Sequence, residues 1–352
     1  MLQKNNDPRV PEIAAALASL SYANDSEPGI RRRRVGKGFC YYLPDGSRLC
    51  DRQAIKRIAS LAIPPAYKDV WISPDPDSHI QATGRDEKGR KQYRYHPRWA
   101  EVRDEAKYGN LVAFGHALPA IRTRIDADLR KRGLSKERVL ASIVWLLEHT
   151  MIRVGNHEYA KQNKSFGLTT LRDRHVQANG DTLRFKFKGK SGKEWDLDLT
   201  DRRIVKVVRG AQDLPGQHLF QYLGEDGERH AIRSNDVNAY IKEISECDFT
   251  AKTFRTWDAT QMAAKLLRET PLPETKKTQA QALNAVIDAI ANRLGNTRAV
   301  CRKSYIHPRV IEHWGEDKLG EEMWRVRQSF EEPIGGLDED ETLLLKWLEA
   351  TG

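Results

Sequence analysis

The sequence predicts an α+β protein, with a small β-rich N-terminal domain and a larger, mainly α-helical domain that carries a small β-sheet. Before residue 100, short runs rich in aromatic and basic residues stand around turn-forming Pro, Asp and Gly residues. Beyond that point, apolar residues recur at helical spacing, and a stretch near residue 185 alternates instead. We therefore expect four segments: a leader (1–30), a β-rich domain (31–103), a mainly helical domain (104–318) and a C-terminal tail (319–352).

Two hairpins are predicted in the N-terminal domain. Residues 39–43 and 47–49 flank Pro44-Asp45-Gly46, which favours a turn. A second pair of strands, over 79–84 and 91–95, flanks a turn at residues 86–89.

Between the hairpins, residues 55–61 predict a short helix that ends before Pro64. The run Arg31–Arg34 is typical of either a phosphate-contacting or a solvated segment. The strand Gln92–Tyr95 mixes amide, aromatic and cationic side chains. Such a strand suits DNA base edges and phosphates, or forms an ordinary sheet edge.

In the larger domain, Ser135 is expected to cap a helix whose apolar stripe ends at Met151. Arg153 lies at the end of that helix, as a structural ion pair or as a cation awaiting an anion. Asn179-Gly180 predicts a two-residue turn. Alternation over 183–188 places its three apolar side chains on one face and its three basic ones on the other.

Another strand is expected over residues 195–199, and residues 215–315 are expected to be mainly helical. Asp196 and Asp198 would share one face of that strand. They could hold Mg²⁺, although an alternating strand with a solvated face explains them better. Gly189-Lys190-Ser191 resembles the end of a phosphate-binding loop, but Arg184 stands where that loop requires glycine, so ATP binding is not supported.

The composition favours a polyanionic partner. Lys and Arg number 59 against 49 Asp and Glu, which gives a net charge of +10. No apolar run approaches the roughly 20 residues that a membrane helix needs, and the N-terminus lacks a signal-peptide core. We expect a soluble intracellular protein with no membrane partner. The four cysteines are too far apart for a zinc motif and are expected to be free thiols.

Tyr305 lies among several cations, close to Arg298, Arg302 and Lys303. A phenol with a pKa of about 10 is a poor nucleophile at neutral pH, and neighbouring cations favour the phenolate and attract a phosphodiester. Taken alone, this pattern is more typical of a packed tyrosine beside a solvated charge run.

Taken together, several segments between about residues 30 and 315 resemble type IB DNA topoisomerases of the compact poxvirus and bacterial form. The similarity rests on their order and spacing. The segments are Gly84–Tyr95, Ile152–Asn156, Gly167–Leu171, Phe187–Lys190, Lys252–Trp257, Gly295–Thr297 and Ser304-Tyr305.

The resemblance implies the fold shared by tyrosine recombinases and topoisomerases IB. It also implies a catalytic set, Arg153, Lys190, Arg255, Asn296 and Tyr305, and DNA contacts at Arg90, Gln92, Tyr93, Tyr95, Tyr159 and Lys252. Tyr305 would attack a backbone phosphorus and form a 3′-phosphotyrosine, and the released 5′-hydroxyl would reseal the strand. No cofactor, metal ion or ATP is expected.

The expected partner is duplex DNA, preferentially supercoiled, which a monomer would enclose as a clamp in the cytoplasm, at the nucleoid. Many family members have histidine where Asn296 stands. Asparagine can donate a hydrogen bond there, but it cannot act as an acid or base. Lys190 is therefore the expected proton donor.

Two alternatives remain. A tyrosine recombinase shares the catalytic plan but typically has histidine three residues before the second arginine, where this chain has Lys252. A non-catalytic DNA-binding protein would explain the charge, but it gives no reason for the set Arg153, Lys190, Arg255 and Tyr305.

Overall fold

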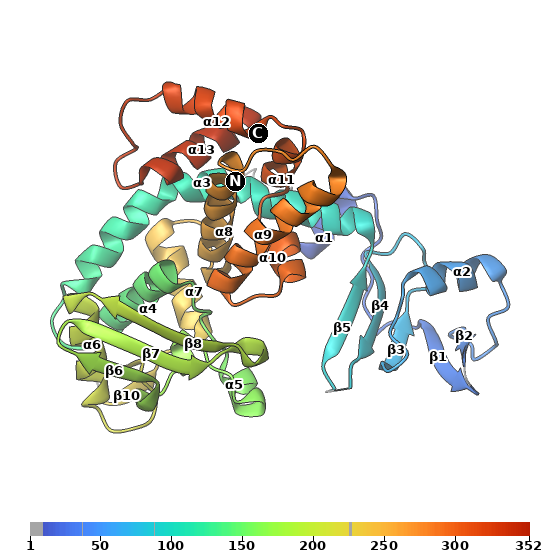
Figure 1. Ribbon diagram of the computed structural model, residues 1–352. Coiled ribbons are helices and arrows are strands. Elements are labelled where there is room, and N and C mark those ends of the chain that lie inside the picture. The colour runs from blue at the N-terminus through green and yellow to red at the C-terminus, as the bar shows by residue number, and fades with distance from the viewer. Residues whose placement is uncertain (1–9, 37, 88, 225–226) are drawn as a thin grey trace. The chain divides into compact units, whose positions relative to one another are not determined.

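The computed structural model describes residues 10–36, 38–87, 89–224 and 227–352. The chain divides into two compact units, Met1–Asn110 and Leu111–Gly352 (Figure 1). The expected boundary after residue 103 falls inside one continuous helix, α3 (Pro97–Leu129). Across the described ranges, no helix combines the length and the apolar character needed to cross a membrane.

The first unit contains a five-stranded antiparallel sheet in the order β2-β1-β3-β4-β5. Its predicted second hairpin is confirmed as β4 and β5, and the helix expected over 55–61 is confirmed as α2, capped by the Asp51 side chain. The elements of this unit are α1 (Pro11–Leu17), β1 (Ile30–Val35), β2 (Gly38–Tyr42), α2 (Arg52–Ser60), β3 (Lys68–Ile72), β4 (Ile80–Arg85) and β5 (Lys91–Tyr95).

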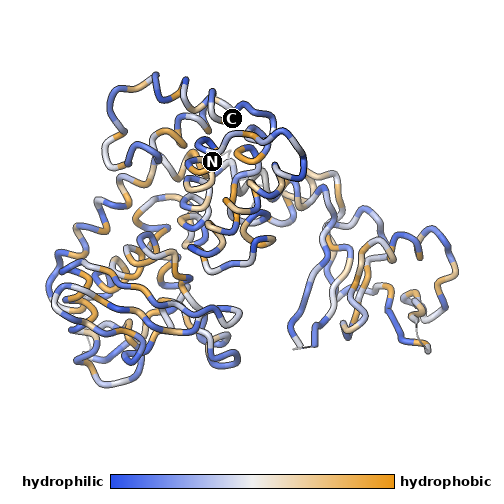
Figure 2. Tube along the Cα trace, in the orientation of Figure 1, coloured by the Kyte–Doolittle hydropathy of each residue, from blue (hydrophilic) through white to orange (hydrophobic). Residues whose placement is uncertain are grey.

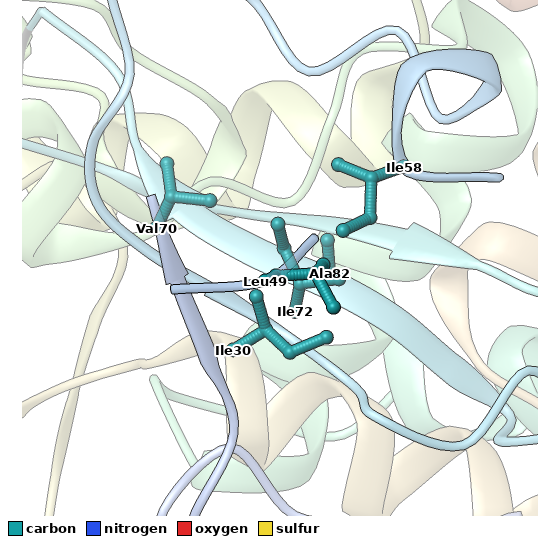
Figure 3. Packing of buried hydrophobic residues seen from close by; sticks show 6 residues of the cluster. All are labelled: Ile30, Leu49, Ile58, Val70, Ile72 and Ala82. Atoms are coloured by element: carbon teal, nitrogen blue, oxygen red, sulfur yellow. The ribbon is translucent and has the colours of Figure 1, made fainter. Parts of the chain in front are cut away.

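An apolar core holds α2 against this sheet (Figure 3). Figure 3 shows the side chains that form it: Ile30, Leu49, Ile58, Val70, Ile72 and Ala82. Burial of such side chains is the main driving force for folding of a small unit. Strand β5, in contrast, is hydrophilic along its length (Figure 2).

The arginine run proved to be a paired strand. We predicted that residues 39–43 pair with 47–49, and backbone bonds from Leu43 N to Ser47 O and from Leu49 N to Tyr41 O do join them. The main partner of β2, however, is β1, which contains Arg31–Arg34. Arg32 tolerates this position because its guanidinium donates to the carbonyls of three residues, at 2.8–3.1 Å: Ile63, Pro64 and Tyr67.

The second unit combines a helical bundle with a three-stranded antiparallel sheet in the order β6-β7-β8. Ser135 caps α4 (Lys136–Thr150), as predicted. Leu183, Phe185 and Phe187 are buried on one face of β7, which confirms the period-two prediction. The strands are β6 (Val176–Asn179), β7 (Thr182–Lys188) and β8 (Glu194–Thr200), with a separate pair, β9 (Gln221–Leu223) and β10 (Arg229–Ala231).

Helices make up most of the remainder of this unit. They are α5 (His157–Asn163), α6 (Arg202–Gln212), α7 (Ser234–Ser245), α8 (Ala251–Arg268), α9 (Lys276–Leu294), α10 (Arg298–Ser304), α11 (Pro308–Gly315), α12 (Leu319–Gln328) and α13 (Glu339–Thr351).

The segment 319–352, which we expected to be a separate tail, belongs to the second unit. Its last helix buries Leu343–Leu345 and Trp347. Glu341 on that helix forms a bidentate ion pair with Arg122 of α3, at 2.7 and 2.8 Å. The acidic residues at the start of α13 therefore join helices together, although in the sequence they look like a solvated extension.

Asp196 and Asp198 lie on β8 opposite basic residues of β7. The Asp196 carboxylate accepts two bonds from Arg184, at 3.0 and 3.1 Å, and lies across from Lys186. Throughout the described ranges, no group of three or more His, Cys, Asp or Glu side chains is arranged to hold a metal ion. Asp196 therefore forms a cross-strand ion pair with Arg184, and Asp198 lies opposite Arg184 on the same solvated strand face. All four cysteines are free thiols, as predicted.

Candidate active site

Arg153 lies beyond α4 rather than on it. The helix ends at Thr150, and Met151 turns the chain through the left-handed region (φ 57°) into an extended segment. Two backbone bonds hold this segment: Leu168 N to Arg153 O, at 2.9 Å, and Thr169 N to Val154 O, at 2.7 Å.

Glycines permit this close approach. A methyl group on Gly167 would lie 2.5 Å from the Arg153 carbonyl oxygen, and Gly155 has a φ of +98°. The backbone beneath Arg153 is therefore fixed by a contact that only glycine allows.

Arg153 and Arg255 join two distant segments of the chain. Nη1 of Arg153 donates to Gly295 O at 3.1 Å, and its Nη2 donates to Oδ1 of Asn296. Nη2 of Arg255 donates to Leu294 O at 2.8 Å, and its Nη1 donates to Met151 O. Both guanidiniums thus connect residues 151–153 to the turn that follows α9.

Arg255 is only 3% exposed, on α8. Phe254 and Trp257 flank it and pack edge-on against Phe114 of α3, with ring centroids 4.9 and 5.9 Å away. In the described part of the chain, neither Arg255 nor Arg153 forms an ion pair with a carboxylate. Burial lowers the pKa of both guanidiniums, and the neighbouring Tyr305 opposes that shift. The buried Arg255 and the half-buried Arg153, both held mainly by carbonyl groups, form a site suited to an anion.

Tyr305 follows directly after α10. Its ring lies under the Arg255 guanidinium, 5.3 Å from Cζ to the ring centroid, and Nζ of Lys252 is 6.0 Å from that centroid. The buried Thr260 hydroxyl fixes the backbone here, because it donates to Tyr305 O at 3.2 Å and accepts from His307 N at 3.1 Å.

The pKa of Tyr305 is lowered from its ordinary value. Burial acts to raise it, but the charge and hydrogen-bonding capacity of Arg255, with the charges of Arg153 and Lys252, outweigh burial. The net effect favours the phenolate, which is the nucleophilic form of a tyrosine.

The arginine and asparagine side chains of the site also contain buried donor atoms. Among the residues that the structure describes, neither Nδ2 of Asn296 nor Nε of Arg255 has a hydrogen-bond acceptor. A buried donor without an acceptor costs about 1–3 kcal/mol. A non-bridging phosphate oxygen placed between the donors and the phenol would remove that cost.

Lys190, unlike the two arginines, lies on an exposed loop. It is exposed, at the tip of the β7–β8 hairpin, where Ser191 (φ 62°) and Gly192 (φ 79°) turn the chain. Its Nζ lies 5.9 Å from the ring centroid of Tyr159 on α5. The structure thus brings four predicted catalytic residues into contact and places Lys190 on an adjoining loop, where Tyr159 is its contact.

The predicted DNA contacts of the first unit lie on β5 and its preceding turn. Tyr93 and Tyr95 are 42% and 41% exposed and stack on each other, with centroids 5.7 Å apart. Arg90 and Gln92 both donate to Asp86, which orders the turn. This strand displays two aromatic faces beside basic residues.

Sequence reasoning missed two residues of the site, Thr260 and Trp195. Thr260 gave no signal, because its role depends on a backbone contact 45 residues away. Trp195 was noted only as part of a strand, although its ring lies against the Gly295 turn.

Comparisons with known proteins agree with this geometry. A family model described as the catalytic core of eukaryotic DNA topoisomerase I matches residues 92–330, and one described as the N-terminal domain of bacterial DNA topoisomerase IB matches residues 38–86. The chain is 33% identical over 326 residues to DNA topoisomerase 1B of Acanthamoeba polyphaga mimivirus, covering 88% of this chain and 97% of the viral protein. It is 24% identical over 251 residues to DNA topoisomerase 1B of vaccinia virus (strain Copenhagen), covering 70% and 75% of the two chains.

Proposed function

The chain belongs to the family of type IB DNA topoisomerases, and from this we propose that it relaxes supercoiled duplex DNA by cutting and resealing one strand. Two observations support the chemistry best: among the described residues, buried donors on Asn296 and Arg255 have no acceptor, and the pKa of Tyr305 is lowered.

In the first step, Tyr305 loses its phenol proton to solvent, Oη of the phenolate attacks a backbone phosphorus, and the bond from phosphorus to the 5′-oxygen breaks. A 3′-phosphotyrosine forms, and the 5′-oxygen takes a proton from Lys190 as it leaves. Arg153 and Arg255 stabilise the charge that develops on the phosphorane, and Asn296 donates to one of its oxygens.

Religation is the reverse reaction. The 5′-hydroxyl gives its proton to Lys190, attacks the phosphotyrosine and releases Tyr305. Because each bond broken is replaced by one of similar energy, we propose that neither ATP nor a metal ion is consumed or required. Rotation of the cut strand between the two steps releases superhelical strain.

DNA binding is assigned to residues of both units. In the first unit, Tyr93 and Tyr95 offer stacking and hydrogen-bonding groups, and Arg90 and Gln92 lie beside them. In the second, Lys252 and Tyr159 lie beside the catalytic residues. We propose that a monomer encloses the duplex as a clamp, prefers supercoiled DNA and acts in the cytoplasm at the nucleoid, consistent with the net charge of +10.

A variant of the nucleophile tests this proposal. Tyr305→Phe is expected to bind DNA but to form no covalent adduct and to relax no plasmid, because it lacks the attacking oxygen. Tyr222→Phe, on β9 and away from the site, is the matched control and should relax plasmid normally. The assay is plasmid relaxation with EDTA and without ATP, with adducts trapped by detergent. Relaxation by Tyr305→Phe, or its abolition by EDTA in the wild-type protein, would contradict the proposal.

A further inference from the structure

Trp195, the second residue of β8, lies between two loops of the site. A methyl group added to Gly295 would lie 2.9 Å from Cζ2 of its ring, and one added to Gly189 would lie 2.6 Å from its Nε1. Both glycines therefore meet the indole at distances that allow no side chain. Gly189 directly precedes Lys190, and Gly295 directly precedes Asn296. One indole thus touches the segments that carry both residues.

The base of the hairpin supports this arrangement. Trp195 stacks on Phe187, with centroids 6.1 Å apart and planes 7° from parallel. Gly189 N donates to Lys193 O at 2.7 Å, which closes the loop around Lys190. Lys193 then reaches the end of α9, where its Nζ lies 3.2 Å from the carbonyl oxygen of Asn292 and 3.3 Å from its Oδ1.

These contacts give the exposed Lys190 its link to the remainder of the site. Arg153 donates to Gly295 O, on the same residue that Trp195 covers. The packing of the indole against Gly295 therefore sets the distance between Lys190 and the Arg153–Asn296 pair. A displacement of about 1 Å can slow a positioned reaction by on the order of a hundredfold.

We propose that Trp195 is a positioning residue for Lys190: it docks the lysine loop on the Gly295 turn so that the amino group reaches the leaving 5′-oxygen. This inference rests on the proposed role of Lys190 as proton donor. If Trp195 positions Lys190, its loss slows only the step that needs the proton. If Trp195 only stabilised the fold, its loss would slow cleavage of every substrate.

A substrate with a sulfur leaving group isolates that step. In a duplex with a 5′-bridging phosphorothiolate at the mapped cleavage position, the bond from phosphorus to sulfur breaks and the sulfur leaves as a thiolate. A thiol has a pKa of roughly 8.5, far below that of an alcohol, so it needs no proton donor. Single-turnover cleavage of the oxygen and sulfur substrates is compared for each variant.

Trp195→Ala is expected to cleave the oxygen substrate about tenfold to a hundredfold more slowly than wild type and the sulfur substrate close to the wild-type rate. Trp195→Phe, whose smaller ring withdraws from Gly295, should show a smaller defect with the same relief. The double variant Lys190→Ala/Trp195→Ala should be no slower than Lys190→Ala alone, because both changes remove one function. Trp324→Ala, at a site 64% exposed on α12, is the matched control and should cleave both substrates normally.

The outcomes separate the inference from the function beneath it. If Trp195→Ala and Trp195→Phe each cleave the sulfur substrate as slowly as the oxygen substrate, the damage is general and the positioning role is overturned. Cleavage of the oxygen substrate at the wild-type rate by both variants would also overturn it. Failure of the sulfur substrate to relieve Lys190→Ala would instead overturn the role of Lys190 as proton donor. Thermal melting of each variant shows whether the protein is folded.

Discussion

The two parts of the site in the second unit are built differently. The first part, which we call the arginine floor, comprises Arg153, Arg255, Asn296 and Tyr305. Arg255 is buried and donates to the backbone carbonyls of Met151 and Leu294, and the half-buried Arg153 donates to Gly295 O and to Oδ1 of Asn296. The second part, the lysine loop (residues 188–195), is exposed around Lys190 and is held by Trp195 and Lys193.

The difference fits the roles that we propose for the two parts. Burying a cation without a counterion costs hydration free energy, and hydrogen bonds to carbonyl groups compensate only part of that loss. The floor therefore holds fixed positive charge ready for a phosphate, and little reorganisation is needed when the transition state forms. In the proposed mechanism the proton donor must reach a 5′-oxygen that arrives with the DNA, which suits a lysine at the exposed tip of a loop that Trp195 docks on the Gly295 turn.

Loss of a floor arginine should produce the largest effect. Arg255→Gln and Arg153→Gln are each expected to slow cleavage by about a hundredfold to a thousandfold, as removal of a preorganised donor does in other enzymes. Both defects should persist on the sulfur substrate, because the floor acts on the non-bridging oxygens. Single-turnover cleavage measures them, with Arg202→Gln, in an exposed ion pair with Asp181, as the control. If either arginine variant cleaved the sulfur substrate at close to the wild-type rate, the floor and the lysine loop would no longer have different roles.

The ionisation of Tyr305 should show the floor's charge directly. Its pKa is expected to be below 10 in the free protein, so the phenolate forms at a lower pH than in an ordinary tyrosine. In Arg255→Gln the pKa should rise, because burial is then opposed by less positive charge. Ultraviolet difference titration of each protein against its Tyr305→Phe counterpart isolates this group. A midpoint that does not move on loss of Arg255 would contradict the proposed electrostatics.

The smallest expected effect is a pH dependence of the free energy of unfolding caused by His175, which packs against Phe187 of β7. His175 is buried between Phe166 and Phe187, and its Nδ1 accepts from Arg172 N at 3.1 Å. Burial, then Arg174 and Arg172, lower its pKa to about 4. In the unfolded chain the pKa is about 6.5, so the unfolded state takes up a proton first as the pH falls.

His175 should therefore stabilise the fold fully above pH 6.5 and lose that contribution progressively from about pH 6.5 to about pH 4. Urea unfolding at pH 7 and pH 5 measures the effect. His175→Gln should lose less stability over this interval than wild type. Equal losses in wild type and His175→Gln would show that His175 does not titrate on unfolding.

Local patterns predicted the fold class, and alternation over 183–188 predicted the buried face of β7. The members of the floor, Arg153, Arg255, Asn296 and Tyr305, were predicted only through the resemblance of several motifs, in order, to type IB topoisomerases. The bonds that hold the floor could not be predicted, because Arg255 donates to Met151, 104 residues away in the sequence, and to Leu294, 39 residues away.

The sequence also did not predict the partners of two charged residues, because their local surroundings in the sequence suggested other roles. The run that contains Arg32 predicted either a phosphate-contacting or a solvated segment, yet Arg32 donates to three carbonyls. The acidic start of α13 looked like an appendage, yet Glu341 pairs with Arg122. In each case a charged residue is placed by a partner distant in sequence.

Mapping the covalent adduct tests the central claim most directly. Wild-type protein is incubated with a duplex whose cut strand cannot be resealed, the adduct is digested, and the DNA-linked peptide is identified by mass spectrometry. We predict a single modified residue, Tyr305, joined through its phenolic oxygen to the 3′-phosphate of the cut strand. An adduct on another residue, or a link to the 5′-phosphate, would contradict the account.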